Sequence, residues 1–146
     1  YLTASAPRRK ARSFMHVYES AEDYLEAILV ITKRRGLVRS IDIANELGYS
    51  KPSVSIAMKK LRESAYIEVD SGGYIRLLPP GAEIAERIYE RHQTLTEFFV
   101  YLGVSRETAA ADACKVEHDL SSETFSKIKD HVWKTMGLGE AEKAEN

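Results

Sequence analysis

The chain has little cysteine, no long apolar run and almost no net charge, and each shortage narrows the possible classes of protein. Cys114 is the only cysteine among 146 residues. No disulfide can therefore form within the chain, and a reducing, cytoplasmic location is expected. No apolar run approaches the roughly 20 residues of a membrane-spanning helix, so no membrane partner is expected. The net charge of −1 neither favours nor excludes binding to nucleic acid.

The charge that is present is unevenly distributed. Lys and Arg outnumber Asp and Glu up to residue 78, and the balance is reversed from residue 79 onward. Four of the basic residues lie in segment 1–14, which has no apolar core. We expect that segment to be disordered or a leader, and not a secretory signal. Without it the first half is balanced, so an interpretation as a DNA-binding protein has to rest on a motif.

Two short helices with a glycine between them are predicted within residues 40–61. Ser40 is expected to cap the first helix, Gly48 to end it, and Ser50 to cap the second. The inner face of the second helix is predicted to consist of Val54, Met58 and Leu61. This order of elements is typical of a helix-turn-helix, whose second helix enters the major groove of DNA.

The exposed face of that second helix carries short hydroxyl and basic side chains, which suit contacts with phosphates and base edges. Its predicted DNA-binding residues are Ser50, Lys51, Pro52, Ser53, Ser55, Lys59 and Lys60. Two β-rich runs around Asp70–Gly73 then predict a hairpin, or wing, from which Arg76 is expected to contact a phosphate. The pattern favours binding to double-stranded DNA; a helical hairpin and ribbon used for protein contacts is the alternative.

The second half is predicted to contain three helices. Pro79–Gly81 is expected to end the hairpin and to start a long helix at about 82–102, which carries His92. Ser105 is expected to cap the next helix, and a last helix is predicted at 122–136. An aromatic and aliphatic stripe on these helices is interpreted as core and homodimer interface; its members are Phe98, Phe99, Val132 and Trp133.

Three side chains that bind metals are spaced i, i+3 and i+4 at Cys114, Glu117 and His118. On a helix these positions share one face, and together they offer a thiolate, a carboxylate and an imidazole. The alternative is a buried free cysteine beside a surface Glu-His pair. Asp23 and Glu26 also share a face of a first helix predicted at 18–33 and capped by Ser20, although a lone pair of this kind is usually solvated.

Three motifs together resemble a known family. They are the opening helix Glu22–Ile28, the pair Arg91-His92, and Cys-x-x-Glu-His-x-Leu-Ser at Cys114–Ser121. The chain resembles the metal-dependent repressors of the diphtheria toxin repressor and manganese transport regulator type. The resemblance implies a mainly α fold: a winged helix-turn-helix domain at 15–79, an all-helical metal-binding and dimerisation domain at 80–137, and a frayed tail at 138–146.

The resemblance also implies the metal ligands. Asp23, Cys114, Glu117 and His118 match the family's main site, and a second site would use Glu26 and His92, with Glu117 shared. Manganese-type members have glutamate where this chain has Cys114, and iron-type members have cysteine there. A thiolate ligand shifts the metal preference of a site away from Mn²⁺ and toward Fe²⁺. The family includes regulators of both types, so the expected ion is Fe²⁺ or Mn²⁺, with Co²⁺, Ni²⁺ or Zn²⁺ as surrogates.

The expected function is therefore transcriptional regulation, with metal as the corepressor of a homodimer that binds operator DNA and represses metal-uptake genes. One alternative is a winged-helix transcription factor that does not depend on metal. Another is a metal-dependent hydrolase, because a mixed Cys, His and Glu site can activate water. No separate general base or substrate pocket motif is evident in the sequence, so we do not expect an enzyme.

Overall fold

The computed structural model describes residues 21–137, and they form a mainly helical protein, which confirms the predicted fold class. The chain divides into two compact units after Arg87, within helix α4. The predicted leader at 1–14, the predicted cap Ser20 and the predicted tail at 138–146 lie outside the described residues. No helix in the described part is both long and apolar enough to cross a membrane.

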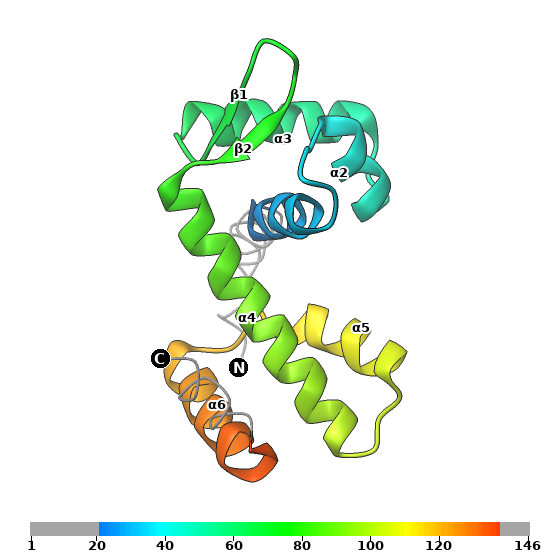
Figure 1. Ribbon diagram of the computed structural model, residues 1–146, viewed down its shortest axis with the longest axis vertical. Helices are drawn as coiled ribbons and strands as arrows, with labels where there is room; N and C mark the ends of the chain where they lie inside the picture. The colour runs from blue at the N-terminus through cyan, green and yellow to red at the C-terminus, as the bar shows by residue number, and fades with distance from the viewer. Residues whose placement is uncertain (1–20, 138–146) are drawn as a thin grey trace, which may run out of the picture. The chain divides into compact units, whose positions relative to one another are not determined.

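The first unit is a winged helix-turn-helix (Figure 1). Helical residues 21–35 are followed by α2 (Ser40–Leu47), α3 (Lys51–Glu63) and a hairpin in which β1 (Ile67–Val69) pairs antiparallel with β2 (Ile75–Leu77). One apolar core joins these elements, and its most deeply buried members include Leu25, Ile28, Ile31, Ile43, Val54 and Ile67. Burial of this core orients α3, so that one face packs inward and the opposite face is exposed.

Local backbone chemistry sets the ends of α2 and α3. Gly48 ends α2 in the left-handed conformation, with φ of 69°, and the Ser50 hydroxyl accepts the Ser53 N–H at 3.3 Å to cap α3. The predicted cap of α2 is wrong, because Ser40 is its first helical residue and Arg39 occupies the cap position. The Asp42 carboxylate accepts the Arg39 N–H at 2.9 Å and satisfies that end of the helix instead.

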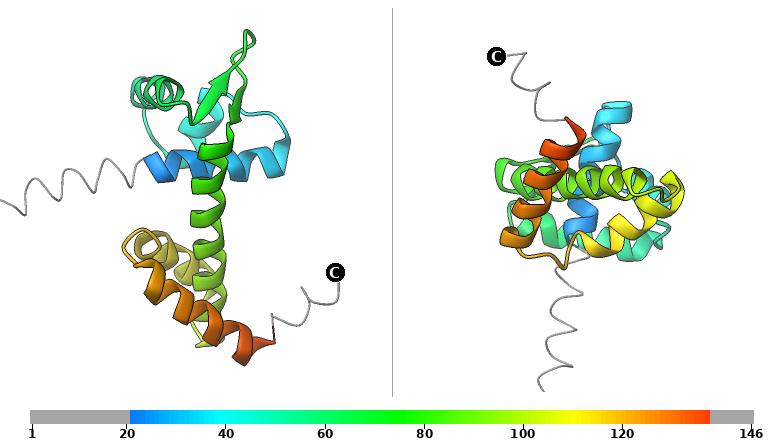
Figure 2. Two further views of the ribbon diagram at one scale, coloured as in Figure 1. Left: turned by 90° about the vertical axis from the view of Figure 1, so that its left-hand side faces the viewer. Right: turned by 90° about the horizontal axis from the view of Figure 1, so that it is seen from below.

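Helix α4 (Pro79–Tyr101) begins a turn earlier than the sequence predicted, and Figure 2 shows it as one continuous helix. Pro79–Gly81 ends the hairpin and starts the helix as predicted, and it forms the first turn itself, where the N–H that proline lacks is not needed. Gly81 is required there by close packing. A Cβ at this position would lie 2.1 Å from the backbone oxygen of Tyr66.

The second unit consists of the C-terminal part of α4, α5 (Arg106–Val116) and α6 (Ser122–Met136) (Figure 1). The Ser105 hydroxyl caps α5 as predicted. Arg106 of α5 bonds Glu97 of α4 at 2.7 Å and lowers the pKa of that carboxyl. Lys129 of α6 forms an ion pair with Glu90 of α4. These contacts tie α5 and α6 to α4.

Candidate metal centre and nucleic-acid interface

All eight residues predicted to contact DNA are exposed. Seven lie on α3 or at its cap, and most of them are on the side away from the buried Val54, Met58 and Leu61. Two of the hydroxyls also have a structural role, because Ser50 caps α3 and donates to the Ser53 hydroxyl at 2.8 Å. The arrangement therefore presents lysine and serine side chains to a partner, and their binding to DNA stays a prediction.

The wing is a tight hairpin in which Asp70 organises the turn. Its Oδ1 accepts the N–H groups of Gly72 and Tyr74, each at 2.9 Å. Arg76 lies opposite Glu68 in the strand register and forms an ion pair with it. A phosphate contact by Arg76 would therefore compete with an existing acidic partner.

Ile56 is a feature of α3 that the sequence interpretation missed. It is 58% exposed, four residues after Pro52 and three before Lys59, on the face opposite the core. The signal was available, since Ile56 is out of phase with the buried residues Val54 and Met58. An exposed apolar side chain among polar ones suits contact with the methyl group of a base edge.

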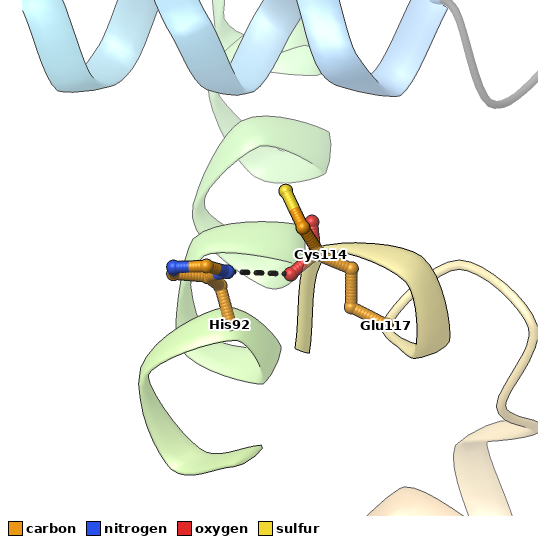
Figure 3. Close-up of side chains that lie close together, drawn as sticks. All are labelled: His92, Cys114 and Glu117. Carbon is orange, nitrogen blue, oxygen red and sulfur yellow. Dashed lines mark hydrogen bonds and ion pairs between the residues drawn. The ribbon is translucent and has the colours of Figure 1, made fainter. Parts of the chain in front are cut away.

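A group of potential metal ligands lies within the second unit (Figure 3). His92 comes from α4, Cys114 from α5, and Glu117 is the residue that ends α5. One donor atom from each of these three lies within 4.8 Å of the others. Cys114 is exposed and Glu117 is fully buried. The alternative of a buried cysteine beside a surface Glu-His pair is therefore wrong.

The Glu117 carboxylate lies between two imidazoles. Its Oε2 is 3.0 Å from Nδ1 of His92, and its Oε1 is 3.4 Å from Nε2 of His118. His118 is the next residue along the chain, just beyond the last helical residue of α5. A carboxylate with one histidine at each oxygen has the donor arrangement that can serve two ions or orient one.

The donor chemistry of this group fits a divalent transition metal. Thiolate, imidazole and carboxylate side chains together suit Fe²⁺, Co²⁺ and Zn²⁺, and they also accept Mn²⁺. A fully buried carboxylate needs a charged or hydrogen-bonding partner, and a cation beside Glu117 would provide one. The side chains that would hold the ion within this unit are His92, Cys114, Glu117 and His118.

Asp23 and Glu26, the other predicted ligands, belong to the first unit. Both lie in the helix at 21–35, three residues apart, and both are partly exposed. Their pairing on one helix face agrees with the spacing argument. Their participation in a site with residues of the second unit stays a prediction.

A winged helix-turn-helix and a transition-metal donor group on one chain define a metal-dependent DNA-binding transcriptional regulator. The N-terminal DNA binding domain of the iron dependent repressors matches residues 16–73, and their metal binding and dimerisation domain matches residues 79–134. Transcriptional regulator MntR of Salmonella typhimurium is 37% identical over 110 residues, which cover 75% of this chain and 70% of the relative. The chain belongs to the iron dependent repressor family.

Solved structures show the same fold. IdeR from T. acidophilum superimposes with a TM-score of 0.67 at 26% identity, over 80% of this chain and 53% of that one. A manganese-dependent transcriptional repressor in complex with manganese gives a TM-score of 0.71 at 25% identity, over 77% of this chain and 52% of that one. The chain thus spans about half the length of these two structures. The relatives are regulators of transcription, which favours the metal-dependent interpretation over both alternatives.

Proposed function

We propose that this chain represses metal-uptake genes in the cytoplasm by binding operator DNA as a homodimer when it holds Fe²⁺ or Mn²⁺. The observation that carries the proposal is the buried Glu117 carboxylate, with an imidazole at each oxygen and the Cys114 thiol in the same group. The description of the matching family names iron, and one similar solved structure is a manganese-dependent repressor in complex with manganese, which supports the same two ions.

In this proposal the predicted ligands come from both units of the chain. His92, Cys114, Glu117 and His118 bind the ion from the second unit, and the family resemblance adds Asp23 and Glu26 from the first. When bound, the ion supplies positive charge that several acidic ligands can share. Side chains of both units that share an ion limit the orientations that the two units can adopt.

The restricted orientation of the two units is the reason that metal binding changes the affinity for DNA. A homodimer has to present two α3 helices at the spacing of two half-sites in successive major grooves. Without shared ligands, many orientations place the two helices wrongly. Bound metal then raises the affinity for DNA, and bound DNA raises the affinity for metal, by the same coupling free energy, typically about 1–3 kcal/mol.

Cys114 is expected to set the choice of metal. A sulfur ligand favours Fe²⁺, Co²⁺ and Zn²⁺ over Mn²⁺, whereas a carboxylate at the same place would favour Mn²⁺. We therefore expect the wild-type protein to prefer Fe²⁺ over Mn²⁺, and Cys114→Glu to move that preference toward Mn²⁺. Anaerobic titrations with each ion measure both affinities and the stoichiometry.

Lys115→Gln is the matched control, because Lys115 is an exposed neighbour on α5 outside the ligand group. Its metal preference should equal that of the wild type. If Cys114→Glu also leaves the preference unchanged, Cys114 is not a ligand.

Binding to operator DNA tests the regulatory part of the proposal. Glu117→Gln and His118→Ala should lose the metal-dependent rise in DNA affinity, measured by fluorescence anisotropy at fixed salt. Asp23→Ala tests the contribution of the first unit in the same way. If DNA binding is the same at every metal concentration in wild type and variants, the chain is a metal-independent winged-helix protein.

A further inference from the structure

Arg91 stands out because it is a guanidinium in the interior of the second unit. In the described part of the chain, Arg91 and Glu117 are the two charged residues that are buried, with exposed fractions of 6% and 0%. Burying a guanidinium is costly unless hydrogen bonds replace its water. The hydrogen bonds that Arg91 makes therefore indicate which part of the structure it stabilises.

Those contacts include two backbone oxygens at the turn between α5 and α6. Nη1 of Arg91 donates to the backbone oxygen of Glu117 at 3.0 Å and to that of Leu120 at 2.6 Å. The guanidinium also lies over the Phe125 ring of α6, 5.2 Å from its centroid. Because the C-terminal end of a helix carries partial negative charge, the end of α5 is a favourable place for a buried cation.

The next residue on α4 contacts the same glutamate in a different way. His92 lies 3.0 Å from the Glu117 carboxylate, while Arg91 bonds the backbone oxygen of Glu117. Two consecutive residues of α4 therefore hold the backbone and the side chain of one residue. The same bonds fix the start of the turn on which His118 lies.

We infer that Arg91 is a positioning residue of the metal centre: it holds the backbone of Glu117 so that Glu117 and His118 present their donor atoms together. Arg91 itself has no role as a ligand, since a guanidinium offers only donors. The inference rests on the proposed function and goes beyond it, because it assigns metal affinity to a residue outside the ligand set. Supporting groups of this kind typically change metal affinity by about 10–100-fold.

A general structural role is the competing explanation, and a double-mutant cycle separates the two. Arg91→Gln should weaken Co²⁺ binding by about 10–100-fold in the wild-type background. If Arg91 acts by positioning the two donors, the same change should weaken binding by a clearly smaller factor when Glu117→Gln is already present, because only the contribution through His118 remains. A structural role would instead lower affinity by a similar factor in both backgrounds.

Co²⁺ gives a readout besides affinity. In the full chain, the near-ultraviolet charge-transfer band reports the bond to Cys114, and the visible bands report coordination geometry. We expect Arg91→Gln to change the visible bands and keep the charge-transfer band at saturating Co²⁺. Arg106→Gln is the control, because Arg106 is an exposed arginine of the same unit and bonds Glu97. The Co²⁺ spectrum and the Co²⁺ affinity of this variant should match those of the wild type.

The outcomes separate the inference from the proposed function. If wild type binds no divalent metal, both fail together. If wild type binds and Arg91→Gln keeps its affinity and spectrum, or loses affinity equally in both backgrounds, only the inference is overturned. Thermal unfolding of the metal-free variants shows whether Arg91→Gln folds. If it does not, Arg91→Lys, which keeps the buried charge but loses the planar donor fork and the guanidinium face over Phe125, takes its place in the same cycle and decides between the same outcomes.

Discussion

Gly81 is the residue at which packing overrides helix propensity. Alanine is normally about 1 kcal/mol better than glycine inside a helix. Here a Cβ would lie 2.1 Å from the Tyr66 backbone oxygen, which also accepts the Leu78 N–H at 3.0 Å. The first turn of α4 and the residue just before β1 are thus held together at a distance that only glycine permits.

We therefore expect Gly81→Ala to destabilise the protein by about 1–3 kcal/mol, as overpacking of a close contact does. Urea unfolding followed by circular dichroism measures the free energy of unfolding. Glu83→Ala, an exposed change in the same helix, should stay within about 0.5 kcal/mol of wild type. A Gly81→Ala protein as stable as wild type would show that the backbone of Tyr66 moves aside freely.

At the scale of elements, the first helix contacts the beginning of α3 through two tyrosines. The rings of Tyr24 and Tyr49 pack edge to face, with centroids 5.7 Å apart and planes at 71°. Tyr24 is buried in the core, and this burial raises its pKa. It directly follows the predicted ligand Asp23, and Tyr49 directly precedes Ser50, the cap of α3. The contact therefore links the proposed metal-binding helix to the proposed DNA-binding helix.

Tyr49→Ala should weaken this link. An aromatic pair is worth about 0.5–1.5 kcal/mol, so the metal-dependent rise in DNA affinity should fall by about 2- to 10-fold while metal affinity without DNA stays unchanged. Tyr49→Phe keeps the ring and should behave as wild type. Fluorescence anisotropy of labelled DNA with and without metal measures the rise in DNA affinity, and a metal titration of the protein alone measures the metal affinity. An equal loss of DNA affinity in the two conditions would mean that Tyr49 touches DNA and does not couple the helices.

At the scale of the whole molecule, the net charge of −1 makes binding to DNA depend on where the positive charges lie. Lys51, Lys59 and Lys60 are exposed on α3. Binding to phosphates releases counterions, so affinity falls as salt rises. The local lysines, and not the total charge, should determine that slope.

Replacing Lys59 and Lys60 with alanine should therefore weaken DNA binding. The slope of log affinity against log salt concentration should become smaller by about 1 for each phosphate that the variant no longer binds. Lys127→Ala, an exposed change on α6, should leave the slope unaltered. Titrations at several salt concentrations measure the slope. An unaltered slope in the Lys59 and Lys60 variant would place the phosphate-binding residues elsewhere on the protein.

Much of the local structure could be predicted because it depends on neighbouring residues. Ser50 and Ser105 cap their helices, and Gly48 ends α2, as their side chains and backbone freedom favour. The apolar spacing also placed α6 correctly at 122–136. The start of α4 was predicted three residues too late. The close packing of Gly81 against Tyr66, which lies far from it in the sequence, cannot be inferred from the neighbouring residues.

The sequence alone determined which metal-binding side chains are available and that Cys114, Glu117 and His118 lie close together along the chain, because spacing is a local property. The predicted common helix face was wrong, since α5 ends at Val116 and only Cys114 of the three is helical. Only the tertiary structure decided that His92 of α4 faces the Glu117 carboxylate, that Cys114 is exposed, and that Arg91 bonds the turn after α5. The physical reason is that α4 and the end of α5 contact each other through hydrogen bonds between residues more than twenty positions apart. The periodicity of a sequence gives no information about contacts at that separation.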